Sequence, residues 1–113
     1  MLYAFPHSSP RPAWRYPKIL VLCLFKDAYL GSQLVPAYVR GVQSQKVMAN
    51  IKHYVLNNQE TNRGSLSANV GQRALHEVYM APFRAGALAG AASAMCSYNL
   101  VNGTYACGSD LGC

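Results

Sequence analysis

The stretch 51–63 contains the side chains of this chain best suited to bind a polyhydroxyl ligand. It reads Ile-Lys-His-Tyr-Val-Leu-Asn-Asn-Gln-Glu-Thr-Asn-Arg. Lys52 offers three charged donors on a flexible stem, Arg63 a rigid fork that can grip two oxygens, and His53 a neutral donor or acceptor. Together they suit a ligand with several hydroxyl groups. The residue types alone also allow a plain alternative, in which the cations are solvated and the histidine is a hydrogen-bonded core residue.

The residues around this Lys-His pair predict a helix followed by a strand. Apolar residues alternate with others from Val47 onward, which predicts a strand over 47–55. The pair would then lie near the carboxyl end of the strand, where parallel α/β folds place their ligand sites. Upstream, Asp27 can N-cap a helix that runs to about Ser44 and contains Pro36. The predicted apolar stripe of this helix consists of Leu30, Leu34, Ala37 or Tyr38, and Val42.

A second helix and strand follow. Residues 69–86 place apolar side chains at helical spacing, with Asn69 and Gln72 spaced as a capping box and Pro82 expected to kink or shorten the last turn. Residues 91–98 predict a second short strand. The order α, β, α, β is typical of parallel βα units, so the sequence predicts an α/β fold.

The first 26 residues predict an irregular arm. Residues 1–17 hold four of the six prolines, and each proline fixes φ and removes a backbone donor. The apolar run Ile19–Phe25 could form a buried strand, but its seven residues are too few to cross a bilayer. Prolines and a histidine occupy the place of an apolar h-region in 1–14, so neither a signal peptide nor a membrane span is predicted, and the compartment stays open.

The charge of the chain does not favour nucleic-acid binding. Ten basic residues against four acidic ones give a formal net charge of +6. The basic residues are spread singly, however, without the run or helical stripe that nucleic acids require. We therefore expect neither a nucleic-acid partner nor a membrane partner.

The four cysteines predict no metal site. Cys23, Cys96, Cys107 and Cys113 lack the C-x-x-C spacing of zinc ligands, and no histidine lies near enough in sequence to complete such a site. We expect no metal and no cofactor. Cys96 and Cys107 flank a turn-rich segment and could approach each other across it, while two free buried thiols are an equally good interpretation.

Three motifs together resemble the first domain of glycoside hydrolase family 3 enzymes, most closely the β-glucosidases. In order they are I-K-H-Y-V-L-N-N-Q-E-T-N-R, S-A-N-V-G-Q-R-A-L-H-E-V-Y-M-A-P-F and M-C-S-Y-N-L-V-N-G-T-Y-A-C. The resemblance covers roughly residues 27–107. It implies a partial (β/α)8 barrel of about two βα units with parallel strands, because 113 residues are fewer than half of the roughly 250 of a complete barrel. Residues 1–26 would be the arm and 27–113 the partial domain.

The resemblance also implies a set of substrate-binding residues. In the family, the Lys-His pair, the arginine that closes the N-Q-E-T-N-R loop and the tyrosine of the M-x-x-Y-N strand line the subsite for the sugar being cleaved. These types stand here at Lys52, His53, Arg63 and Tyr98, and Met95 matches a residue that borders the pocket.

The family's catalytic carboxylates have no counterpart in these residues. The nucleophile belongs to a Ser-Asp-Trp motif on a later strand, and the acid/base lies further on. Ser109-Asp110-Leu111 follows Tyr98 too closely to be that motif, so Asp110 is predicted to be a turn residue. Glu60 is predicted to orient its loop rather than to attack the sugar.

The sequence thus predicts a fragment of a glycoside hydrolase that acts on β-linked glucosides, retaining in its complete form and inactive as this chain alone. Its partner would be a carbohydrate, a β-glucoside or a related sugar. A non-catalytic sugar-binding or interaction protein derived from such an enzyme is the alternative, and a basic nucleic-acid-binding module is a weaker third hypothesis.

Overall fold

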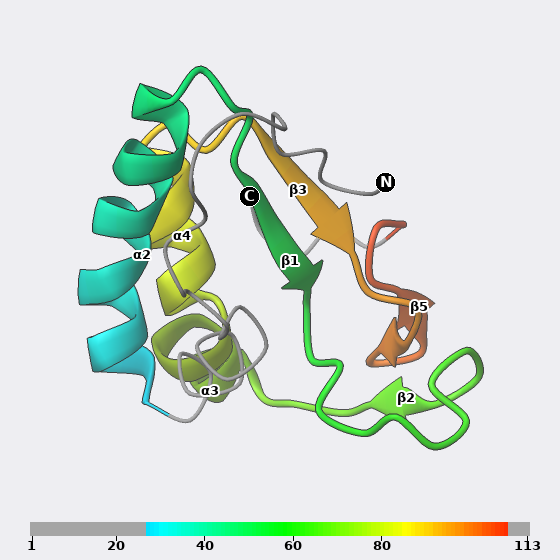
Figure 1. Cartoon of the computed structure of the whole chain (residues 1–113). Helices are drawn as coiled ribbons and strands as arrows, with labels where there is room; N and C mark the ends of the chain where they lie inside the picture. The colour runs from blue at the N-terminus through cyan, green and yellow to red at the C-terminus, as the bar shows by residue number, and fades with distance from the viewer. Residues whose placement is uncertain (1–26, 109–113) are drawn as a thin grey trace.

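A computed structural model describes residues 27–108, in which helices α2 and α4 cover one face of a two-stranded sheet (Figure 1). The elements in chain order are α2 (Ala28–Ser44), β1 (Asn50–Tyr54), β2 (Ser67–Ala68), α3 (Gln72–Ala74), the π-helix η1 (Leu75–Tyr79), α4 (Ala81–Leu88), β3 (Ser93–Cys96), β4 (Leu100–Val101) and β5 (Thr104–Tyr105). The arm over 1–26, the possible strand Ile19–Phe25 and the turn at Asp110 lie outside the described residues.

The main sheet confirms the predicted parallel order. β1 pairs with β3 in parallel, with Asn50 opposite Ser93 and Lys52 opposite Met95, and the register shifts between Lys52 and Tyr54. The strand is shorter than the predicted 47–55 and begins at Asn50. Because both strands run in the same direction, their carboxyl ends meet at one edge of the sheet.

Helix α2 begins as predicted, but the predicted apolar stripe was wrong. The Asp27 side chain accepts a hydrogen bond from the backbone N–H of Leu30 at 2.9 Å, and the helix ends at Ser44. Leu30, Leu34 and Tyr38 are 46%, 41% and 56% exposed. The buried positions are instead Gly31 and Val39, which lie on a different face of the helix.

The reason is the close packing of α2 on α4. Gly86 of α4 lies where a Cβ atom would come within 3.0 Å of Val35 Cγ1 and 3.2 Å of Ile51 Cδ1. α4 therefore approaches both α2 and β1 closely, because Gly86 has no side chain to hold them apart. Leu30, Leu34 and Tyr38 of the predicted stripe lie on the exposed side of α2, whereas Val42, its last member, is half-buried.

The predicted helix over 69–86 was wrong in its start and in its continuity. Asn69 makes no cap; its side-chain oxygen accepts from Ser67 Oγ at 2.9 Å, and Gly71 precedes α3 without any side-chain cap. In η1 the backbone hydrogen bonds change from the i to i−4 pattern of an α-helix to the i to i−5 pattern of a π-helix. For example, the Met80 N–H donates to Leu75 O at 2.8 Å. Pro82 then lies in the first turn of α4, where its missing N–H costs no helical hydrogen bond.

A second small sheet was not predicted. β2 pairs with β4 in parallel, and β4 pairs with β5 in an antiparallel hairpin. Asn102 and Gly103 turn the hairpin with φ of 49° and 86°, the left-handed region that an Asn-Gly pair tolerates. The Asn102 amide also accepts from Val70 N–H at 2.8 Å and donates to Val70 O at 3.0 Å. Two-residue strands show no alternation, which is why the sequence pattern missed them.

The core lies between the helices and the ends of the two sheets. Its buried members are Val55, Leu56, Leu75, Phe83, Val101 and Ala106. Tyr54 packs edge-on against Phe83, with ring centroids 5.2 Å apart. The residues that follow the Lys-His pair are therefore held in apolar packing. Among residues 27–108, no helix is long and apolar enough to cross a membrane.

Candidate functional site

The predicted site residues come from the exit of β1, the exit of β3 and the loop between β1 and β2. Lys52 and His53 lie in the second half of strand β1, and Met95 lies opposite Lys52 on β3. Tyr98 follows the end of β3, and Arg63 closes the polar loop after β1. The parallel pairing of β1 and β3 places these segments at one edge of the sheet.

The structure brings Arg63 and Tyr98 into direct contact. The guanidinium carbon of Arg63 lies 4.9 Å from the centroid of the Tyr98 ring, within the range of a cation–π interaction. Arg63 Nη1 also lies 2.7 Å from Glu60 Oε2. Tyr98 remains 61% exposed, so one side of this pair stays open to a ligand.

Backbone and side-chain hydrogen bonds fold the polar loop on itself. Asn57 Nδ2 donates to Glu60 Oε1 at 3.2 Å, and the backbone N–H of Arg63 donates to Glu60 O at 3.4 Å. The N–H groups of Ser65 and Leu66 both donate to Asn62 O at 2.9 Å. These hydrogen bonds order the loop as a series of turns, and its Arg63 side chain lies against Tyr98 in the segment after β3.

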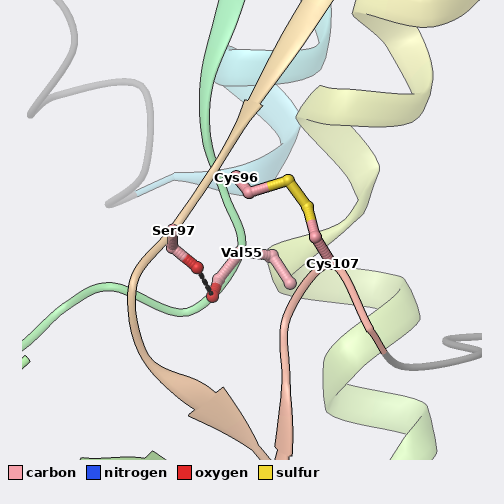
Figure 2. Close-up of a disulfide and its surroundings, with 4 residues drawn as sticks. All are labelled: Val55, Cys96, Ser97 and Cys107. Carbon is pink, nitrogen blue, oxygen red and sulfur yellow. Dashed lines mark hydrogen bonds between the residues drawn. A yellow bond between two sulfur atoms is a disulfide. The ribbon is translucent and has the colours of Figure 1, made fainter. Parts of the chain in front are cut away.

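Two buried polar residues that the sequence patterns did not indicate, Ser97 and Asn99, connect the segment after β3 to the end of β1 through hydrogen bonds, and Figure 2 shows the bond of Ser97. Ser97 Oγ donates to Val55 O at 2.8 Å, and Asn99 Nδ2 donates to the same oxygen at 3.1 Å. Both residues are buried, while Tyr98 between them is exposed. The alternation of Ser97, Tyr98 and Asn99 in an extended segment was the available signal, since neighbouring side chains there point to opposite sides.

The structure also settles the pairing of two cysteines. Cys96 and Cys107 form a disulfide with their Cα atoms 5.9 Å apart, as Figure 2 shows. The alternative of two free buried thiols was wrong, and both residues are exposed rather than buried. The disulfide encloses the segment that carries Ser97, Tyr98 and Asn99, and so restricts how this segment can move away from Val55.

The pKa of His53 depends on its burial and on the charges of Lys52, Glu60 and Arg63. Burial is the main cause that lowers the pKa of His53 below the ordinary value of 6.5, and the charge of Lys52 is the second. Glu60 acts in the opposite direction, while Arg63 lowers the pKa further. At neutral pH the imidazole is therefore uncharged and can donate or accept a hydrogen bond.

This lowered pKa predicts how stability depends on pH. Because the unfolded chain binds a proton on His53 at a higher pH than the folded chain does, the free energy of unfolding falls as pH drops from above 6.5 through the folded pKa. We expect an NMR titration of the His53 ring to give a midpoint below 6.5. We also expect His53→Gln to remove this part of the pH dependence in urea unfolding between pH 7.5 and 5. A midpoint above 6.5 would contradict this account.

No group of three or more histidine, cysteine, aspartate or glutamate side chains within residues 27–108 is arranged to hold a metal ion. The side chains at the candidate site are an ammonium, a guanidinium, an imidazole and a phenol, which can form hydrogen bonds with the oxygen atoms of a ligand.

Comparison with known proteins points to one family. Residues 23–111 match the model described as glycosyl hydrolase family 3 N terminal domain. A probable beta-glucosidase M from Emericella nidulans is 46% identical over 92 residues, and a probable beta-glucosidase L from Aspergillus fumigatus is 49% identical over 84 residues. These matches cover 72% and 74% of this chain but only 12% and 11% of the relatives. The chain thus spans about one-ninth of the length of the proteins it resembles.

Solved structures agree with the sequence match. DesR, a beta-glucosidase from Streptomyces venezuelae solved in complex with D-glucose, superposes with a TM-score of 0.73 at 42% identity, over 75% of this chain and 11% of that one. The beta-D-glucoside glucohydrolase from Trichoderma reesei superposes with a TM-score of 0.70 at 48% identity, over 72% and 11% of the two chains. The α/β arrangement of α2, β1, α4 and β3 is therefore that of a segment found in these enzymes.

Proposed function

The chain belongs to glycoside hydrolase family 3, and from this premise we propose that residues 27–113 are part of the barrel-type catalytic domain of a β-glucosidase, preceded by an arm over 1–26. The parallel β1–β3 pair with helices on one face supports two βα units of a (β/α)8 barrel. The β-glucosidase relatives, of which this chain covers 12% and 11%, support the same proposal.

Within this segment, Lys52, His53, Arg63 and Tyr98 bind the sugar that is cleaved, and Met95 borders the pocket. The observation that carries this proposal is the contact of the Arg63 guanidinium with the Tyr98 ring, beside the exit of the strand that holds Lys52 and His53. A cationic fork, an ammonium and a neutral imidazole can each bond sugar hydroxyls, while the tyrosine offers a ring face and a hydroxyl. The ligand is a neutral β-glucoside or a related sugar.

The chemistry of the complete enzyme needs two carboxyl groups that this segment does not provide. Retaining hydrolysis places a nucleophile and an acid/base about 5 to 5.5 Å apart. Each of the three acidic side chains among residues 27–108 already has a partner: Asp27 caps α2, Glu60 pairs with Arg63 inside the proposed site, and Glu77 pairs with Arg73. The segment binds and orients the sugar, and the reacting carboxylates come from the rest of the barrel.

The proposal predicts opposite outcomes for the isolated chain and for a chimera. The 113-residue chain alone should not hydrolyse an aryl β-glucoside above the buffer rate, since it lacks both the nucleophile and the acid. The Trichoderma reesei glucohydrolase, with its matching segment replaced by residues 27–108, should remain active. The measurement is release of the aryl alcohol by both proteins.

Two outcomes would contradict the proposal. One is hydrolysis that co-purifies with the isolated chain through several columns. The other is a chimera that folds, as judged by its thermal transition, but has no activity. An inactive folded chimera together with glucose binding by the isolated chain would support the non-catalytic sugar-binding alternative.

A further inference from the structure

Glu60 lies at the centre of the polar loop and uses both carboxylate oxygens. Oε2 accepts from Arg63 Nη1 at 2.7 Å, and Oε1 accepts from Asn57 Nδ2 at 3.2 Å. A carboxylate held at both oxygens has a defined orientation, and a charge-assisted hydrogen bond of this length is among the stronger kinds. The Glu60 side chain is still 69% exposed and that of Arg63 is 46% exposed, so the pair lies at the surface where a ligand can reach it.

The Glu60–Arg63 pair continues into a chain of contacts across the sheet edge. Asn57 bonds Glu60, Glu60 bonds Arg63, and the Arg63 guanidinium rests on the Tyr98 ring. Tyr98 is fixed in turn, because Ser97 and Asn99 on either side of it bond Val55 O. The chain of contacts therefore joins the loop after β1 to the segment after β3.

Glu60 also supplies the negative charge among the positively charged side chains near His53. Lys52 and Arg63 both act on His53 as positive neighbours, and Glu60 is the neighbour of opposite sign. The other acidic residues within 27–108 are bonded elsewhere, Asp27 at the N-terminus of α2 and Glu77 to Arg73. Without the Glu60 carboxylate, Arg63 would lose the acceptor of its 2.7 Å hydrogen bond and the negative charge that offsets the nearby positive charges, so its side chain would be free to turn toward solvent.

We propose that Glu60 is a positioning residue: it holds the Arg63 guanidinium against Tyr98, so that the remaining Arg63 donors face the sugar. This inference rests on the proposed function for the identity of the ligand, but the contact that it explains is independent of any ligand. Glu60 touches Arg63 and does not act on the sugar itself. A misplaced guanidinium would weaken sugar binding although every binding residue remained in the chain.

The test uses the 113-residue chain and three variants. Glu60→Gln keeps the size of the side chain and removes its charge, and Glu60→Asp keeps the charge but shortens the reach by one methylene. Glu77→Gln is the matched control, because Glu77 forms an exposed ion pair with Arg73, a pair of the same type on another element. For each protein the ring-current shift of the Arg63 side-chain protons is measured by NMR, and glucose is titrated to obtain Kd.

We expect Glu60→Gln to abolish most of the ring-current shift and to raise the glucose Kd by about tenfold. Glu60→Asp should show a partial loss of both, and Glu77→Gln should match the wild-type chain. If Glu60→Gln does not fold, the ring-current shift and the glucose Kd of Glu60→Asp test the positioning role instead. Unchanged ring-current shifts, or an unchanged glucose Kd, in the Glu60 variants would overturn the inference.

The two proposals fail separately in this experiment. A wild-type chain that does not bind glucose contradicts sugar binding by this segment, while the NMR shifts still show whether Glu60 holds Arg63 on Tyr98. A chain that binds glucose equally well with or without the Glu60 carboxylate leaves the sugar-binding proposal intact and overturns the positioning role.

Discussion

Arg63→Met in the active chimera should lower kcat/KM for an aryl β-glucoside by about one to two decades while the fold survives. A hydrogen bond from a charged group to a sugar hydroxyl contributes roughly 1.5 to 3 kcal/mol, and this is the stabilisation that the methionine removes. Methionine keeps much of the apolar bulk on the Tyr98 ring, so the loss reports the guanidinium. Lys52→Met should have an effect of the same size for the same reason.

Arg73→Met is the control for this measurement. Arg73 also pairs with a glutamate, at 3.1 Å, and its side chain is 87% exposed on α3. Its replacement should leave kcat/KM unchanged, since an exposed helix pair contributes little. An Arg63→Met variant that lost thermal stability but kept its activity per folded molecule would show that Arg63 is structural and not a sugar ligand.

Breaking the Cys96–Cys107 disulfide should lower the free energy of unfolding of the chain by about 2 to 3 kcal/mol. The two cysteines are 11 residues apart, and opening a loop of this length restores conformational freedom mainly to the unfolded state. The expected result is a lower urea midpoint for a Cys96→Ser, Cys107→Ser double variant made in parallel with the oxidised wild-type chain.

Two controls accompany the disulfide measurement. Intact mass after alkylation without reductant shows whether the bridge has formed, and material made under oxidising conditions should leave Cys96 and Cys107 unlabelled. Alkylation at both positions in such material would rule the bridge out. A double variant with the urea midpoint of the wild type would mean that hydrogen bonds to Val55, rather than the disulfide, hold the segment in place.

Local signals in the sequence were sufficient for several parts of the fold. The carboxylate of Asp27 marked the start of α2, because a short acceptor before a helix satisfies a free backbone N–H. The order of helices and strands predicted the parallel β1–β3 pair, since parallel strands need a crossover between them. Each of these features depends on neighbouring residues or on the order of elements along the chain.

Other features depended on packing between elements, and the sequence patterns misplaced them. The buried face of α2 was assigned to large residues, whereas Gly86 lets α4 approach the side that carries Val35 and Val39. Residues 69–86 were expected to form one helix that Pro82 kinks or shortens near its end, whereas Pro82 lies in the first turn of a separate helix that begins at Ala81. The β4–β5 hairpin was missed, because strands of two residues have no measurable period.

For the candidate site, the sequence by itself determined which chemical groups are present and, through three motifs, the family to which the chain belongs. Only the tertiary structure decided that Arg63 rests on Tyr98, that Ser97 and Asn99 share the Val55 carbonyl, and that Cys96 bonds Cys107. The physical reason is distance along the chain. A cap or a turn is set by residues a few positions apart, whereas these contacts form only after β1 and β3 pair and bring their carboxyl ends to one edge of the sheet.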